Sequence, residues 1–158
     1  MTACGFETVE DDLEAIGWGL RQVSRRSGFS RARITRLKST TLEHDGSQAE
    51  RAFRRWIADL ARLDDQHDLA RLHRRFYSPL SPAVSPPGNR PCLNGAGVSR
   101  ALIIIGWSER FLAESLAMHR TELRRVLENG GEVSPRPSRW LDVLCDGHID
   151  LPRPDLTD

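Results

Sequence analysis

Residues 105–130 read IGWSERFLAESLAMHRTELRRVLENG, and residues 16–39 read IGWGLRQVSRRSGFSRARITRLKS. Both stretches begin with Ile-Gly-Trp. When Trp18 is placed over Trp107, the apolar positions agree along both stretches while the polar positions differ. Copies that share apolar positions share a core rather than a surface. The sequence therefore predicts two copies of one folded unit.

A second tryptophan follows each copy, Trp56 after the first and Trp140 after the second, and these two pairs account for all four tryptophans of the chain. Trp56 lies in a run whose apolar residues recur at the helical period, and Trp140 precedes a similar pattern. Because indole rings bury a large apolar area, we expect the tryptophans to be core residues of the two units.

Each copy has the residues that two closely crossing helices require. A small residue in the first helix lets the helices approach, a small residue between them permits a tight turn, and an apolar residue pins the second helix to the core. These residues are Ser24, Gly28 and Ile34 in the first copy and Ala113, Ala117 and Leu123 in the second. No strand pattern of useful length occurs, so the predicted fold class is all-α.

The helix ends can also be predicted, because polar residues that cap helices and residues that stop them are spaced along both copies. We expect a helix capped by Asp11 or Asp12 to end near Gly17, a helix capped by Ser99 to run through Ile105, and a last helix to start at Pro135 and Pro137. The other expected caps are Ser30, Ser47 and His119, and Asn129-Gly130-Gly131 is an expected stop.

The expected domain organisation has four parts. Residues 9–77 form a first helix-turn-helix domain with a helical extension, and residues 98–148 form a second one. Between them, residues 78–97 are rich in Pro, Gly and Ser and almost without charge, which is typical of a linker. Residues 149–158 form a polar tail, extended or mobile.

Composition and motif content exclude several classes of protein. The longest apolar run is too short to span a membrane, and the acidic N-terminus does not resemble a secretory signal, so we expect a cytoplasmic protein. Three distant cysteines argue against a disulfide framework and a zinc site. No catalytic motif is present, and the acidic group at 64–68 reads as a solvated helix face. We expect no enzyme, no metal, no cofactor and no small-molecule ligand.

The electrostatics of the two copies differ although the net charge is only +1. Between Ile16 and Thr40 there are seven Arg or Lys residues and no Asp or Glu, whereas Ile105 to Gly130 has four of each sign. A basic face without counter-charges favours contact with a nucleic acid backbone. The first copy is therefore the stronger candidate for DNA contact.

The stretch WSERFLAESLAMHRTELRRVLENG resembles the helix-turn-helix of the lambda-repressor-like (Xre-type) family of DNA-binding domains. The first copy resembles the same motif, except that Ser24 replaces the small alanine matched by Ala113. Together the two copies cover about two thirds of the chain. The resemblance implies that the second helix of each copy enters the major groove of double-stranded DNA.

Arginine makes the commonest specific contact to guanine and also neutralises phosphate, so the outward faces of the second helices are the predicted DNA-binding sites. The outward residues are Arg31, Arg33, Thr35 and Arg36 in the first copy and Arg120, Thr121, Arg124 and Arg125 in the second. The resemblance assigns base contacts to Arg31, Ala32, Arg36, Arg120, Thr121 and Arg125. Arg21, Arg25, Arg26 and Lys38 are placed for phosphate, and Ser30 and His119 lie at the helix starts beside it.

These features predict a sequence-specific transcriptional regulator, with repression of the phage or mobile-element type as the default implied by the resemblance. The alternative is a DNA-anchored adaptor in which the second helix-turn-helix mediates protein contact or self-assembly. A third hypothesis is non-specific binding of nucleic acid by the basic first unit. The sequence leaves homodimerisation open.

Overall fold

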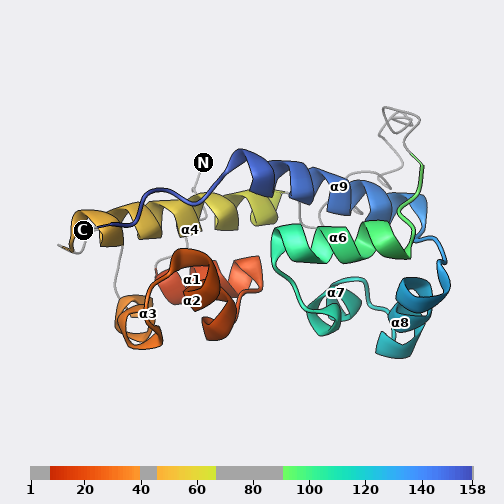
Figure 1. The fold of residues 1–158 in the computed structure, drawn as a ribbon, viewed down its shortest axis with the longest axis horizontal. Coiled ribbons are helices and arrows are strands. Elements are labelled where there is room, and N and C mark those ends of the chain that lie inside the picture. Colours follow the sequence, from red (N-terminus) through yellow and green to blue (C-terminus); the bar gives the residue numbers. More distant parts are fainter. Residues whose placement is uncertain (1–7, 40–45, 67–90, 158) are drawn as a thin grey trace, which may run out of the picture. The chain divides into compact units, whose positions relative to one another are not determined.

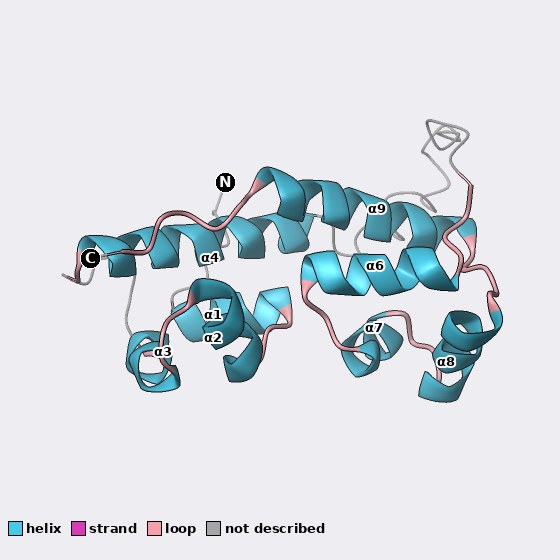
Figure 2. Ribbon diagram, in the orientation of Figure 1, coloured by secondary structure: helices cyan, strands magenta, loops and turns pink. Residues whose placement is uncertain are grey.

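The computed structural model describes residues 8–39, 46–66 and 91–157, and in these residues it contains eight α-helices and no strand, which confirms the all-α prediction (Figure 1, Figure 2). One isolated bridge joins Asn94 and Glu132. In chain order the helices are α1 (Val9–Ile16), α2 (Leu20–Ser27), α3 (Arg31–Lys38), α4 (Gln48–Gln66), α6 (Gly95–Ile105), α7 (Glu109–Ser115), α8 (Arg120–Asn129) and α9 (Pro135–Asp150). Among these residues no helix is long and apolar enough to cross a membrane.

The helices group into two compact units. The first contains α1 to α4 together with residues 148–157, and the second contains α6 to α8 and the part of α9 that ends at Gly147. The predicted loop at 40–45, most of the predicted helical extension at 67–77 and the linker at 78–90 lie outside the described residues.

The Ile-Gly-Trp sequence of the first unit ends a helix. α1 stops at Ile16, and Gly17 follows in the left-handed conformation with φ of 75°. The Gly17 N–H donates to the Glu14 carbonyl at 3.0 Å, and the Trp18 N–H donates to the Leu13 carbonyl at 3.1 Å. This pair of bonds satisfies carbonyls that a helix end would otherwise leave unpaired.

The second unit repeats this arrangement where α6 ends. Gly106 has φ of 85°, and the Trp107 N–H donates to the Leu102 carbonyl at 3.1 Å. Each cap directs the tryptophan side chain that follows it into the core of the same unit. The rings of Trp18 and Trp56 lie 5.7 Å apart between centroids, and those of Trp107 and Trp140 lie 5.3 Å apart. All four tryptophans are buried, as predicted.

The turn between α2 and α3 and the turn between α7 and α8 share one backbone feature, a residue with positive φ. Gly28 has φ of 78°, and Ala117 is the one non-glycine residue with positive φ in the described part of the chain, at 50°. Ser24 stands where the second copy has Ala113, and its hydroxyl has a partner. It donates to the Phe29 carbonyl at 2.8 Å and so ties α2 to the residues before α3.

Most predicted caps are confirmed. The Ser30 hydroxyl accepts from the Arg33 N–H at 3.2 Å, the Ser47 hydroxyl accepts from the Glu50 N–H at 3.3 Å, and His119 Nδ1 accepts from the Thr121 N–H at 3.3 Å. α8 ends at Asn129 with Gly130 at positive φ, and α9 begins at Pro135.

Two predicted caps are wrong. Thr8 caps α1, with Asp11 three residues later completing a capping box, because Thr8 lies before the first buried residue of the helix. α6 begins at Gly95 and is capped by Asn94 rather than Ser99, so its first turn falls in the predicted linker. The reason is tertiary: a Cβ on Gly95 would lie 2.4 Å from the Val126 carbonyl oxygen, so glycine lets α6 start against α8.

The C-terminal residues differ most from the prediction of a polar, extended or mobile tail. α9 continues to Asp150, and although residues 151–157 are not helical, they belong to the first unit. The Trp56 indole N–H donates to the Leu151 carbonyl at 3.0 Å, and Figure 1 shows the end of the chain running beside α4. A buried indole N–H needs an acceptor, and this segment supplies it.

Asp64 is also placed differently from the prediction of a solvated face. It is 8% exposed, and its Oδ1 lies 3.2 Å from Nε2 of His148, which is equally buried. The two residues stand 84 positions apart. Asp68, the one acidic residue of that group beyond residue 66, lies outside the described residues.

Candidate nucleic-acid interface

The helix pair α2–α3 presents a basic surface, because its large buried residues hold one side against the core and most of its exposed residues are arginines. Ile34 and Leu37 are fully buried and hold α3 against the core, together with Val23 on α2. The opposite side of α3 is exposed and contains no carboxylate. Its exposed residues are Arg31, Ala32, Thr35 and Arg36.

Arg33 does not belong to this exposed surface, although the sequence predicted it there. Its Nε lies 3.1 Å from Glu50 Oε1, and its Nη2 donates to the Ser47 hydroxyl at 3.0 Å. Its guanidinium also stacks over the Phe29 ring at 4.1 Å. Three contacts within the first unit thus hold Arg33 in place, and the side chain is only 26% exposed.

Glu50 is shared by two arginines. Besides Arg33, it pairs with Arg36, whose Nη2 lies 2.5 Å from Glu50 Oε1. Burial favours a raised pKa for Glu50, but the hydrogen bond from Arg33 and the charges of Arg36 and Arg33 together lower it. The carboxylate therefore stays ionised and fixes the start of α4 against α3. Arg36 differs from Arg33 in that 68% of its side chain is exposed.

Four further cations were predicted to contact phosphate, and they divide into two groups. Arg21 and Arg25 are exposed on α2. Arg26 is half-buried and lies over the Trp18 ring at 5.0 Å, and burial followed by the charge of Arg25 lowers its pKa. Lys38 pairs with Glu10 at 2.9 Å. The structure thus leaves Arg21 and Arg25 on the open surface and engages Arg26 and Lys38 within the unit.

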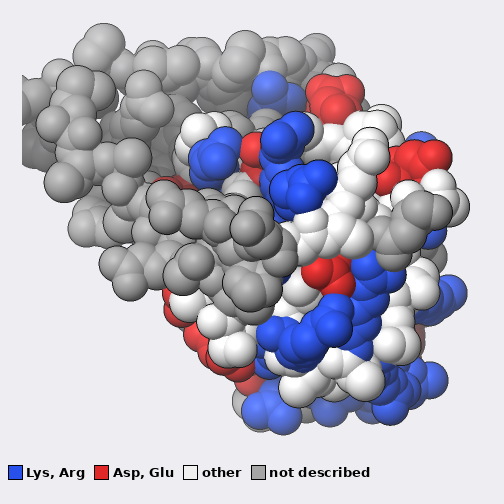
Figure 3. Space-filling view, turned by 90° about the vertical axis from the view of Figure 1, so that its left-hand side faces the viewer, with Lys and Arg blue, Asp and Glu red and all other residues white. Residues whose placement is uncertain are grey.

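Several cations lie together on the side of the first unit where α3 lies. Figure 3 views that side, and Lys and Arg side chains cluster there, with some Asp and Glu side chains between and beside them. Within the described part of the chain, Arg31 has no ion-pair partner. An exposed arginine cluster of this kind suits phosphate and guanine, which both accept paired hydrogen bonds.

The helix pair α7–α8 has the same form with a different surface. Leu112, Ala113 and Leu123 are buried and hold the two helices together. All the residues predicted to contact DNA from this unit are exposed, namely His119, Arg120, Thr121, Arg124 and Arg125. The exposed side of α8 also carries two carboxylates, Glu122 and Glu128.

One residue that was predicted to contact DNA from the second unit has an acidic partner. Arg124 Nε lies 3.4 Å from Glu109 Oε2, a contact that joins α8 to α7. Arg110 pairs with Glu114 along α7 at 2.9 Å. Both pairs are exposed, where such contacts contribute little to stability but do reduce the positive field. The second unit is therefore the less basic of the two.

Sequence analysis missed Glu50, which decides how α3 presents its arginines. The only sequence signal was its place on the buried side of the amphipathic helix α4, three residues before Phe53. An acidic residue at a buried position points to a cationic partner elsewhere in the fold, because an isolated buried charge is costly. Which arginine is the partner could not be deduced from spacing.

The described residues also hold no group of three or more His, Cys, Asp or Glu side chains that could bind a metal ion. Comparison of the chain with protein-family models, with curated proteins and with solved structures gives no match.

Proposed function

We propose that this protein binds double-stranded DNA in a sequence-specific manner and acts as a transcriptional regulator. The observation that carries the proposal is the α2–α3 pair: two short helices joined through a glycine in the left-handed conformation, with an exposed basic side on α3. The major groove admits one α-helix, and α3 has both the form and the charge for that contact.

The roles of the individual residues follow from their exposure. Arg31 and Arg36 are the proposed base readers, because both are exposed, Arg31 in the first turn of α3 and Arg36 in its last turn, where its pair with Glu50 leaves 68% of the side chain exposed. Ala32 and Thr35 can contact a thymine methyl group or a base edge. Arg21 and Arg25 neutralise phosphates. Arg33 is a positioning residue that acts through Glu50.

In this proposal the second unit is a weaker reader. Arg120, Thr121 and Arg125 are exposed on α8, but Arg124 is engaged by Glu109 and carboxylates share the surface. Two unequal readers in one chain predict a bipartite site with unequal halves. A homodimer would lengthen that site. Repression of the phage or mobile-element type rests on the resemblance to the lambda-repressor-like family.

The alternative is an adaptor that is anchored on DNA by the first unit and contacts a protein through the second. The pairing of Arg124 with Glu109 favours it, because a surface of alternating charges suits a protein partner better than phosphate. The two proposals differ in what the second unit binds.

Selection from a randomised duplex library tests both proposals, with affinity then followed against salt. The intact chain is needed, because a fragment ending at residue 77 lacks residues 148–157 of the first unit. Arg31→Gln and Arg125→Gln probe the two units, and Arg100→Gln, exposed on α6, is the matched control.

For a base-reading arginine, we expect Arg31→Gln to weaken specific binding about tenfold or more, whereas the control should bind as the parent does. Arg125→Gln should weaken binding if both units read DNA, and unchanged binding supports the adaptor. If no motif is enriched and the affinity depends steeply on salt, the protein is not a sequence-specific regulator. Non-specific binding of nucleic acid by the basic first unit would then explain the affinity.

A further inference from the structure

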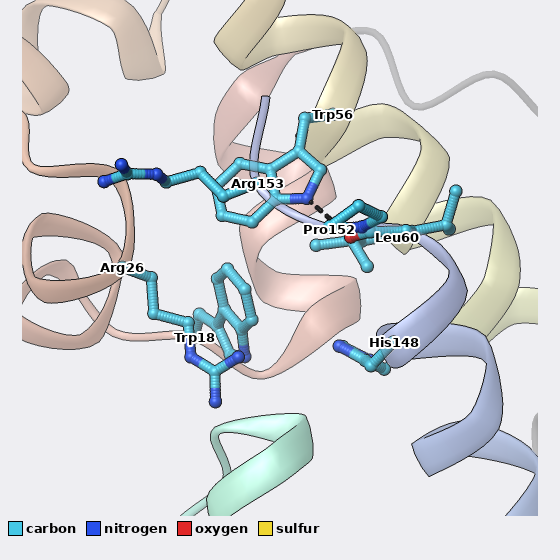
Figure 4. Close-up of a pocket in the computed structure, with 8 residues that line it drawn as sticks. Trp18, Arg26, Trp56, Leu60, His148, Pro152 and Arg153 are labelled. Carbon is cyan, nitrogen blue, oxygen red and sulfur yellow. Dashed lines mark hydrogen bonds between the residues drawn. The ribbon is translucent and has the colours of Figure 1, made fainter. Parts of the chain in front are cut away.

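Residues 151–157 reach the helix pair α2–α3, although they follow the last helix of the chain. The segment is held at its start, where the Trp56 indole N–H donates to the Leu151 carbonyl at 3.0 Å. Figure 4 shows this bond, with the Arg153 side chain extending from the segment toward the first helix pair. The Arg153 Nη1 atom lies 3.7 Å from the position that a Cβ on Gly28 would occupy. Because Gly28 directly follows α2, the guanidinium of Arg153 lies at the turn between α2 and α3.

The Arg153 side chain is exposed and forms no ion pair with any residue that the structure describes. Asp155 is the nearest acidic residue along the chain, and its charge and that of Arg153 act on each other without forming an ion pair. The Asp155 carboxylate instead accepts the N–H and the hydroxyl of Thr157, at 3.1 and 2.8 Å. Among the described residues, the guanidinium donors of Arg153 are thus left for a partner outside the chain.

Two prolines restrict the backbone on either side of Arg153. The sequence from Leu151 to Pro154 reads Leu-Pro-Arg-Pro. A proline ring fixes its own φ, and it also restricts the residue before it to extended conformations. The backbone at Arg153 is therefore ordered before a partner binds, so binding has to order little more than the side chain. This lowers the entropic cost of the contact.

Arg153 lies close to two other exposed arginines at this turn. Arg25 is in the last turn of α2, and Arg31 is the first residue of α3. In a helix-turn-helix, the N-terminal residues of the second helix contact base edges while the first helix crosses the DNA backbone. The proposed docking of α3 in the major groove thus brings the turn at Gly28 beside the phosphates at the edge of the groove.

We propose that Arg153 belongs to the DNA interface of the first unit and binds a backbone phosphate beside the turn between α2 and α3. The inference rests on the proposed contact of this unit with DNA. A guanidinium forms paired hydrogen bonds with phosphate oxygens, and a neutralised phosphate releases counterions. Such a contact carries no base information, so Arg153 contributes affinity while α3 contributes specificity. The sequence had placed Arg153 in a polar tail, far from the helix pair along the chain.

Arg153→Gln and Arg153→Lys in the intact chain test this inference. Arg100→Gln, exposed on α6, is the control for the loss of a charge, and Arg31→Gln is the marker of base reading. Each variant is titrated by fluorescence anisotropy against two probes, the selected duplex and a duplex of random sequence, at several salt concentrations. Thermal unfolding followed by circular dichroism gives the Tm of each variant.

We expect Arg153→Gln to weaken binding to both duplexes by the same factor, about three- to tenfold, because hydrogen bonds to a charged group are lost. The slope of log affinity against log salt should become shallower by about 1. Arg153→Lys keeps the charge and should therefore bind more tightly than Arg153→Gln and keep the parent's salt dependence. Both variants should unfold within about 3 °C of the parent, because the side chain is exposed.

Unchanged affinity and salt dependence in Arg153→Gln would overturn the inference, and so would a loss of equal size in Arg153→Lys or a loss confined to the selected duplex. Failure of the proposed function has a different signature. If no motif is selected, the regulator fails, and the random duplex still shows whether Arg153 contacts phosphate. If Arg31→Gln lowers the preference for the selected duplex and Arg153→Gln changes nothing, the regulator stands and this inference fails. A chain that binds neither duplex would contradict both.

Discussion

Arg33 and Arg31 lie two residues apart on α3, and the structure predicts opposite consequences when each is replaced by alanine. Arg33→Ala removes the contact with Glu50 at 3.1 Å, the hydrogen bond to Ser47 at 3.0 Å and the stacking on Phe29 at 4.1 Å. It also leaves a carboxylate that is 9% exposed with Arg36, a largely exposed partner, and with the charge of the buried Arg54 nearby.

The expected loss of stability follows from these contacts. A hydrogen bond to a charged group contributes about 1.5–3 kcal/mol, and stacking of a cation on an aromatic ring contributes about 0.5–1 kcal/mol. These contributions sum to about 2–4 kcal/mol, and partial rearrangement of Arg36 toward Glu50 offsets part of the sum. We therefore expect Arg33→Ala to lower the free energy of unfolding by about 1–3 kcal/mol, which corresponds to a fall of about 3–12 °C in Tm. Arg31→Ala, at an exposed position without an ion pair in the described residues, should change it by less than about 0.5 kcal/mol.

DNA binding should show the reverse order. Arg31→Ala should weaken binding to the selected site by about 1–3 kcal/mol, whereas folded Arg33→Ala should retain most of its affinity. Thermal unfolding followed by circular dichroism gives the first quantity, and fluorescence anisotropy well below the Tm gives the second. Equal Tm values for the two variants, or a larger loss of DNA affinity in folded Arg33→Ala than in Arg31→Ala, would refute the division between a positioning and a reading arginine.

Three further predictions concern stability. Burial, and then the charge of Asp11, raises the pKa of Asp12 from 3.8 to about 6 against the opposing charge of Arg62, so the folded state holds this proton longer than the unfolded state does. The free energy of unfolding should therefore fall by at most about 3 kcal/mol as the pH rises from 3.8 to about 6. Asp12→Asn should abolish that fall, which urea unfolding at several pH values measures. The prediction is contradicted if the unfolding free energies of variant and parent differ by the same amount below pH 4 as at pH 7. Gly95→Ala places a Cβ 2.4 Å from the α8 backbone and should cost about 1–3 kcal/mol in thermal unfolding; an unchanged Tm would show that α6 can shift freely. Deletion of residues 148–158 should lower the Tm of the first unit and shift tryptophan emission to longer wavelength, and a spectrum identical to that of the parent would speak against the packing of this segment.

Much of the candidate interface could be predicted because its determinants are local. Gly28 and Ala117 were identified as turn residues from their place in the repeat, and both have positive φ. Ser30 and His119 were identified as caps, and both accept from the first turn of their helix. A cap bond forms between residues two or three positions apart, so spacing along the chain is enough to predict it.

The same reasoning could not separate the exposed cations from the engaged ones. Arg31 and Arg33 have similar places in the sequence, yet only Arg33 meets Glu50, which lies 17 positions away on another helix. Lys38 likewise meets Glu10, 28 positions away. A charge pattern gives the sign of a surface, but an ion pair depends on which helices pack together.

The sequence by itself determined the all-α class, the repeat, the helix ends that rest on local caps, and the place of the four tryptophans in the two cores, because periodicity and capping are properties of neighbouring residues. Only the tertiary structure decided where α6 begins, which arginines of α3 face solvent, and that residues 148–157 complete the first unit. The bond between Trp56 and Leu151 spans 95 positions, and that between Asp64 and His148 spans 84. Such contacts arise from the burial of polar groups that need a partner, and the partner is selected by packing rather than by distance along the chain.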